Sequence, residues 1–146
     1  MISRKALVAL ATSLFLTIPL AQALEPVDPQ PAVPLTFEDP AYQKVVPEVA
    51  REMIADGVVV VIDVREPIER LKEGFIKGSV NIPLGQLKKG ARLTVAPDFD
   101  QKILVHCRSG VRAERAARIL ISTGYRHVYN MYGTSQWPYG LENSAQ

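Results

Sequence analysis

The sequence predicts an α/β fold in which a mainly parallel central sheet is flanked by helices. Three observations lead to this prediction. Short apolar runs of strand length recur along the chain, and the clearest is Val58–Ile62. Segments with helical periodicity lie between these runs, and glycine or proline marks their ends. Strands that alternate with helices in this way are typical of a parallel sheet covered on both faces.

Local signals define the first four elements. Pro47 to Asp56 is expected to form a helix, since proline is favoured in a first turn and a glycine follows the segment. Val58 to Ile62 is a run of β-branched apolar residues, which predicts a strand buried on both faces. Pro67 to Glu73 suits a short helix that a second glycine closes, and Ser79 to Ile82 suits a short strand.

The second half of the chain repeats the alternation. Lys102 to His106 contains three consecutive large apolar residues and predicts another buried strand. Val111 to Thr123 has apolar residues at helical spacing, and Gly124 can cap the resulting amphipathic helix. His127 to Tyr129 is the last expected strand. The ligand site of such a sheet is expected beyond the carboxyl ends of its strands.

The N-terminal region is predicted to be a targeting segment. Residues 1–23 contain two basic residues, an apolar run and a final Ala-Gln-Ala, which is the layout of a secretory signal peptide. The alternative is an uncleaved membrane anchor, although the apolar run is marginal against the roughly 20 residues that span a bilayer. Residues 24–35 contain four prolines and predict an extended linker, and residues 36–141 are expected to form the folded domain. The mature chain is therefore expected to be periplasmic or secreted, with no membrane attachment after cleavage.

Charge and motif content exclude several classes of function. The 17 basic and 15 acidic residues give a formal net charge of +2, and the surplus charges are Arg4 and Lys5 in the predicted leader. The remainder is formally neutral, so its charge does not indicate nucleic-acid binding. The sequence has no Cys/His cluster for a metal and no glycine-rich dinucleotide motif. We therefore expect no metal, no cofactor and no nucleic-acid partner.

Cys107 is the single cysteine, and its position predicts a reactive thiol. It ends a predicted strand, and Arg108-Ser109-Gly110 leads from it directly into a predicted helix. Backbone N–H groups of a tight loop at a helix N-terminus form an anion cradle, which should lower the pKa of the thiol below its usual value of about 8.5. The alternative is an inert cysteine buried at a strand end.

Three other polar residues lie at strand ends. Asp63 and Arg65 follow the first buried strand, and we favour a structural ion pair there, for example between Arg65 and Glu69, over substrate contact for Asp63. For Arg65 the two interpretations are balanced. His106 precedes Cys107 and should point to the opposite face of the sheet, so a buried structural histidine is favoured over a general base.

Three segments resemble motifs of the rhodanese family. CRSGVR resembles the family's active-site loop, which begins with cysteine and often ends in arginine. DVREPIERLKEGFIKGSVNIP resembles the DVR…E…GHI-x-GA-x-NIP signature, and GYRHVYNMYGTSQW resembles the family's final strand, glycine-rich turn and tryptophan. The resemblance covers about Phe37 to Trp137. Phe75, Ser79 and Thr134 depart from it, since the family often has histidine, alanine and glycine there.

The resemblance implies a small rhodanese-like domain with sulfurtransferase activity, in which Cys107 carries the transferred sulfur as a persulfide. The implied substrates are thiosulfate or another small anionic sulfur donor, and a thiol or cyanide acceptor. No cofactor is implied, and the sequence identifies no protein partner. The expected donor-binding residues are Arg112, Arg108, Ser109, Gly110, Val111 and Arg65. Arg112 is favoured as the donor clamp because it matches the family's terminal arginine.

Two other functions are left open. Cysteine phosphatases also have a cysteine loop that leads into a helix, but they need an arginine six positions after the cysteine. Ala113 occupies that position here, and Arg112 is five positions away, so the loop suits a sulfur atom better than a phosphoryl group. The domain could also be a sulfur carrier or a protein-binding module with little turnover of its own. A thiosulfate turnover assay would separate a carrier from an enzyme.

Overall fold

The computed structural model describes residues 38–143. The predicted leader (1–23) and the predicted linker (24–35) lie outside this range. Within the described range, no helix combines the length and the apolar character that crossing a membrane requires.

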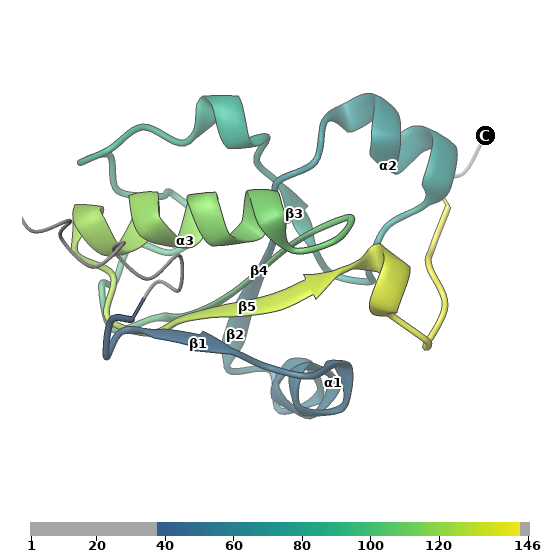
Figure 1. The fold of residues 1–146 in the computed structure, drawn as a ribbon, viewed down its shortest axis with the longest axis horizontal. Coiled ribbons are helices and arrows are strands. Elements are labelled where there is room, and N and C mark those ends of the chain that lie inside the picture. Colours follow the sequence, from purple (N-terminus) through teal and green to yellow (C-terminus); the bar gives the residue numbers. More distant parts are fainter. Residues whose placement is uncertain (1–37, 144–146) are drawn as a thin grey trace, which may run out of the picture. The chain divides into compact units, whose positions relative to one another are not determined.

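A five-stranded sheet forms the centre of the domain (Figure 1). Its spatial order is β1-β5-β4-β2-β3, and every pairing between neighbours is parallel. The strands are β1 (Tyr42–Lys44), β2 (Val59–Asp63), β3 (Val80–Asn81), β4 (Lys102–Cys107) and β5 (Val128–Gly133). The helices are α1 (Pro47–Ala55), α2 (Pro67–Glu73) and α3 (Val111–Thr123), with short 3-10 helices at Leu84–Gln86 and Thr134–Gln136. The predicted fold class is confirmed.

Residues of β4 alternate between two hydrophobic cores, one on each face of the sheet. Ile103, Val105 and Cys107 pack on the α3 face, together with the buried alanines of that helix. Leu104 packs on the α1 face, where Ala50 covers it. Figure 1 shows α1 and α3 on opposite sides of the sheet. Because side chains alternate along a strand, Cys107 shares the face and the neighbourhood of α3.

The structure differs from the sequence prediction in two strands, β1 and β5. Strand β1 was not expected, because it is a short edge strand with a half-buried tyrosine and two exposed polar residues. Strand β5 continues four residues beyond Tyr129, to Gly133. Its pairing with β4 shifts by one residue between Asn130 and Gly133, because Tyr132 has a left-handed backbone with φ of 62°. This bulge in β5 places Gly133 opposite Cys107.

Candidate active site

Cys107 lies at the carboxyl end of β4 and is 1% exposed. Gly110 is the N-cap of α3 and has a left-handed backbone with φ of 102°, a conformation that glycine adopts readily. This turn brings the Gly110 N–H to 3.1 Å from the Cys107 Sγ, to which it donates a hydrogen bond. The N-terminus of α3 and the Gly110 N–H thus both favour negative charge on the sulfur. One N–H of the anion cradle expected from the sequence, that of Gly110, therefore donates to this sulfur.

Gly133 and Ser135, which follow the bulge in β5, contact the backbone of the cysteine loop. An ideal Cβ on Gly133 would lie 2.3 Å from the backbone carbonyl carbon of Arg108, so the two backbones meet where only glycine fits. Ser135 donates two hydrogen bonds to the Arg108 carbonyl oxygen, from its N–H at 3.0 Å and from its hydroxyl at 2.6 Å. The loop is therefore packed against β5 and the turn that follows it.

Asn130 is a site residue that the sequence analysis missed. Its side chain is buried on β5 and hydrogen-bonds to Gly110, to Tyr42 and to the N–H of Tyr132. An isolated asparagine in a strand carries no recognisable motif. A polar residue directly after the last expected strand, followed by another apolar residue, was the one available signal.

Arg112 lies beside the loop and forms a two-pronged ion pair with Glu69 of α2. Its Nη1 and Nη2 donate to the two carboxylate oxygens at 2.6 and 2.7 Å. The Arg112 guanidinium lowers the pKa of Glu69 to about 2, so the pair is fully charged near neutral pH. The pKa of Arg112 is raised, mainly by Glu69 and to a smaller extent by the Cys107 sulfur. Arg112 thus interacts electrostatically with the Cys107 sulfur and at the same time forms an ion pair with the Glu69 carboxylate.

Arg65 was expected either to contact substrate or to form a structural ion pair, and the structure shows the ion pair. Its side chain is 0% exposed, and it donates to the Asp63 carboxylate at 2.8 Å and to the Gly74 carbonyl oxygen at 2.8 Å. It also lies 3.3 Å from Glu73, whereas Glu69 pairs with Arg112. The suggested Arg65–Glu69 pair is therefore wrong. Arg65 is a buried framework residue that joins the end of β2 to the end of α2.

Asp63 has the structural role that the sequence favoured. Its carboxylate also accepts a hydrogen bond from Arg70 at 3.3 Å, and Arg70 reaches on to the Ser79 hydroxyl at 2.8 Å. Burial works to raise the pKa of Asp63, but the hydrogen bonds from Arg65 and the other nearby positive groups outweigh it and lower the pKa below its usual value. The network closes the β2 end of the sheet next to the site.

His106 is buried on the face of the sheet opposite Cys107, as predicted. Its Nδ1 lies 3.3 Å from the Cys107 carbonyl oxygen, and its Nε2 has no hydrogen-bond partner among the described residues. Burial lowers the pKa of His106 to about 4, although the Asp63 carboxylate opposes the shift. The ring is therefore neutral near pH 7, and it is fully buried on the far side of the sheet from the Cys107 side chain.

The remaining loop residues form the outer rim of the site. Arg108, Ser109 and Val111 are exposed, and Val111 is 63% exposed although it is apolar. A small cavity of about 130 Å³ borders the loop at Ser109, Gly110 and Val111. The cavity therefore borders the loop on the side of these residues, and Cys107 itself is not among the residues that line it.

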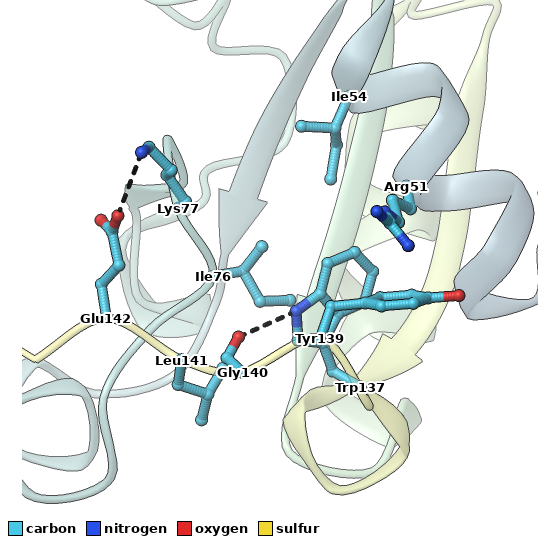
Figure 2. A pocket seen from close by; sticks show the side chains of 9 residues that line it. All are labelled: Arg51, Ile54, Ile76, Lys77, Trp137, Tyr139, Gly140, Leu141 and Glu142. Atoms are coloured by element: carbon cyan, nitrogen blue, oxygen red, sulfur yellow. Dashed lines mark hydrogen bonds and ion pairs between the residues drawn. The ribbon is translucent and has the colours of Figure 1, made fainter.

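A larger cavity of about 380 Å³ lies away from the cysteine loop (Figure 2). Trp137 and Tyr139 form one wall, and Ile54 and Arg51 of α1 form another. The Trp137 indole N–H donates to the Gly140 carbonyl oxygen at 3.1 Å and thereby ties the C-terminal segment to this wall. None of the residues that line this cavity belongs to the loop 107–112. Trp137 is thus part of the wall of a cavity that does not include the cysteine loop.

The described part of the chain has no evident set of metal ligands. Between residues 38 and 143, no group of three or more histidine, cysteine, aspartate or glutamate side chains is arranged to hold a metal ion.

Known proteins are similar to this chain in sequence and in fold. A mitochondrial protein of Schizosaccharomyces pombe that carries the provisional name thiosulfate sulfurtransferase is 36% identical over 89 residues, which cover 54% of this chain and 62% of that protein. Thiosulfate sulfurtransferase GlpE of Haemophilus influenzae is 29% identical over 93 residues, covering 64% of this chain and 84% of that enzyme. The chain spans 51–62% of the length of four curated relatives that it matches.

A solved structure described as a rhodanese with anions from E. coli has a TM-score of 0.52 and 31% sequence identity, covering 58% of this chain and 98% of that one. The model of the rhodanese-like domain matches residues 46–137, which contain α1 to α3, β2 to β5 and the whole cysteine loop. The chain therefore belongs to the rhodanese-like domain family.

Proposed function

We propose that this protein is a sulfurtransferase that moves a sulfane sulfur from thiosulfate or a similar donor to a nucleophilic acceptor. The observation that carries the proposal is the hydrogen bond from the Gly110 N–H to the Cys107 Sγ at the N-terminus of α3. Relatives named as thiosulfate sulfurtransferases support the choice of donor.

In the first half-reaction the Cys107 thiolate attacks the outer sulfur of thiosulfate. A new S–S bond forms to Cys107, the original S–S bond of thiosulfate breaks, and sulfite leaves with the bonding electron pair. The product is a Cys107 persulfide whose terminal sulfur carries the negative charge. The helix N-terminus and the loop N–H groups stabilise that charge, and Arg112 attracts the anionic donor.

In the second half-reaction a nucleophile attacks the terminal sulfur of the persulfide. Cyanide takes this sulfur and becomes thiocyanate, and the Cys107 thiolate is regenerated with the electron pair of the broken bond. A thiol acceptor would leave with the sulfur as a persulfide of its own. Because the enzyme alternates between two covalent forms, steady-state kinetics should be ping-pong.

The test is thiosulfate-to-cyanide turnover by the parent chain and by Cys107→Ser. We expect turnover in the parent and its loss in Cys107→Ser, with an unchanged circular dichroism spectrum. A Cys107→Ser variant that keeps more than a few per cent of the activity would refute the assignment. Sulfur loading without turnover would instead identify a carrier.

We further propose that the protein acts outside the cytoplasm, on the evidence of the leader-like residues 1–23. Processing after Ala23 would leave Leu24 as the first residue. Mass spectrometry of the protein from its native host checks this, and an intact Met1 terminus in a membrane fraction would contradict it.

A further inference from the structure

Asn130 is a buried amide on a sheet face that is otherwise packed with apolar side chains. It is 1% exposed and lies on the α3 side of β5, two residues after the core residue Val128. Burying an amide costs free energy unless hydrogen bonds satisfy it. The partners of Asn130 therefore show what the residue does.

The Asn130 side chain joins three segments of the chain. Its Nδ2 donates to the Gly110 carbonyl oxygen at 3.2 Å and to the Tyr42 hydroxyl at 3.1 Å. Its Oδ1 accepts the N–H of Tyr132 at 2.9 Å. One amide thus connects β1, the bulge in β5 and the N-cap of α3.

The bulge and the loop depend on each other for their shape. Tyr132 has a positive φ of 62°, which is unfavourable for a residue with a side chain and needs local support. An ideal Cβ on Gly110 would lie 3.0 Å from the Tyr132 Cα, so the two backbones are in close contact. The hydrogen bond from the Tyr132 N–H to Asn130 therefore stabilises Tyr132 in this strained conformation, where its backbone contacts the cysteine loop at Gly110.

We propose that Asn130 is a positioning residue for sulfur transfer, which orients the Gly110 N–H toward the Cys107 sulfur. The Gly110 carbonyl oxygen accepts hydrogen bonds from Asn130 and from the Glu114 N–H at 2.9 Å, while the Gly110 N–H donates to the sulfur. The Gly110 N–H and carbonyl belong to two peptide groups joined at the Gly110 Cα, so holding the carbonyl oxygen from two sides restricts how Gly110 can rotate and favours the backbone in which its N–H faces the sulfur. Asn130 has no contact with the sulfur and acts through Gly110. This inference rests on the proposed function only for its reference to sulfur transfer.

Alkylation of Cys107 by iodoacetamide tests the inference without any sulfur chemistry. Only the ionised sulfur reacts at a useful rate, so the pH profile of alkylation reports how well the loop stabilises negative charge. In Asn130→Ala we expect the rate near pH 7 to fall about tenfold, as for one lost hydrogen bond to a charged group, and to approach the parent rate at high pH. In turnover assays kcat should fall more than KM rises.

Asn130→Asp and Tyr132→Gly separate positioning from folding. Asn130→Asp can still accept the Tyr132 N–H but cannot donate to Gly110, and its charge opposes ionisation of the sulfur, so alkylation near pH 7 should slow at least as much. Adding Tyr132→Gly to Asn130→Ala should restore stability, since glycine tolerates the positive φ, but should not restore the alkylation rate. If neither Asn130 variant folds, the residue is a framework residue and the inference is wrong.

Asn81→Ala is the matched control. The Asn81 side chain also donates from one amide to two backbone oxygens, those of Asp63 and Arg65 at 2.9 and 2.8 Å, but it has no contact with the cysteine loop. We expect Asn81→Ala to keep the parent alkylation profile. An unchanged profile in folded Asn130→Ala, or an equal shift in Asn81→Ala, would overturn the inference. A parent chain that fails to transfer sulfur while these shifts are seen would refute the proposed function alone.

Discussion

At the scale of single residues, we propose Arg112 as the cation that holds an anionic donor near Cys107. A guanidinium has five N–H donors, and Glu69 occupies one on each of the two terminal nitrogens. The pair with Glu69 therefore leaves N–H groups of Arg112 that face the Cys107 sulfur or a donor bound there. Glu69 thus orients Arg112 and at the same time reduces the positive charge that a donor meets.

This sharing leads to a prediction for the two arginines of the loop. Arg112→Ala should raise KM for thiosulfate and lower kcat/KM about tenfold to a hundredfold, because it removes a charge contact and leaves Glu69 unpaired beside the site. Arg112→Lys should recover part of the loss, since lysine cannot bind two oxygens in the same fork geometry. Arg108→Ala should have a smaller effect, because Arg108 is exposed at the rim. Steady-state kinetics of the three variants measures this.

The double variant Arg112→Ala with Glu69→Gln is the control for the unpaired carboxylate. It should bind thiosulfate better than Arg112→Ala alone, because the repulsive charge is gone. A parent-like KM in Arg112→Ala together with a raised KM in Arg108→Ala would show that Arg108 holds the donor.

At the scale of elements, the bulge in β5 determines which residue faces the cysteine loop. The register shift places Gly133 opposite Cys107, where an ideal Cβ would lie 2.3 Å from the Arg108 backbone. Gly133→Ala should therefore destabilise the domain by about 1–3 kcal/mol, because the loop must move to admit a methyl group. The same movement should lower the turnover.

Gly85→Ala is the matched control for this prediction. An ideal Cβ on Gly85 meets nothing within 4 Å, so its stability should stay within about 0.5 kcal/mol of the parent. Chemical denaturation of both variants gives the comparison. Equal free energies of unfolding for Gly133→Ala and Gly85→Ala would contradict the account of the bulge.

The elements with strong local signals could be predicted from the sequence, and those without them could not. Helix α2 begins at its proline and ends before its glycine, and α3 ends at Thr123 before Gly124, as expected. Strand β1 was missed because a three-residue edge strand has little apolar surface to reveal it. The end of β5 was missed because Asn130 and the bulge interrupt the apolar pattern.

For the candidate active site, too, the features that depend on neighbours in sequence could be predicted, and those that depend on distant residues could not. The position of Cys107 in a loop before a helix follows from neighbours in sequence. The contacts around it come from long-range pairings: Arg112 and Glu69 are 43 positions apart, and Asn130 and Gly110 are 20 apart. Such partners are fixed by the topology of the sheet, which one sequence does not specify residue by residue. Arg65 shows the same limit, since its strand-end position suits either a substrate contact or the buried ion pair that forms.

At the scale of the whole molecule, burial of His106 links stability to pH. The pKa of His106 is about 4 in the folded chain because burial disfavours the charged ring, whereas an unfolded chain binds the proton near pH 6.5. Between these pH values the unfolded state therefore binds more protons than the folded state. The contribution of His106 to the free energy of unfolding is fully present above pH 6.5 and is lost as the pH falls toward 4. The slope should reach about 1.4 kcal/mol per pH unit.

Chemical denaturation between these pH values checks the prediction, with His106→Gln as the comparison. The variant should lose less stability than the parent as the pH falls from 6.5 to 4, whatever its stability at neutral pH. Equal slopes in the two proteins would show that His106 does not cause the acid sensitivity.

The central claim is that Cys107 carries the sulfur, and intact-protein mass spectrometry after brief exposure to thiosulfate tests it most directly. We expect that the parent chain gains the mass of one sulfur atom, that fragmentation places this atom on Cys107, and that cyanide removes it. The Cys107→Ser variant should gain no mass under the same conditions. A parent chain that stays at its original mass while it still converts thiosulfate and cyanide into thiocyanate would contradict the account.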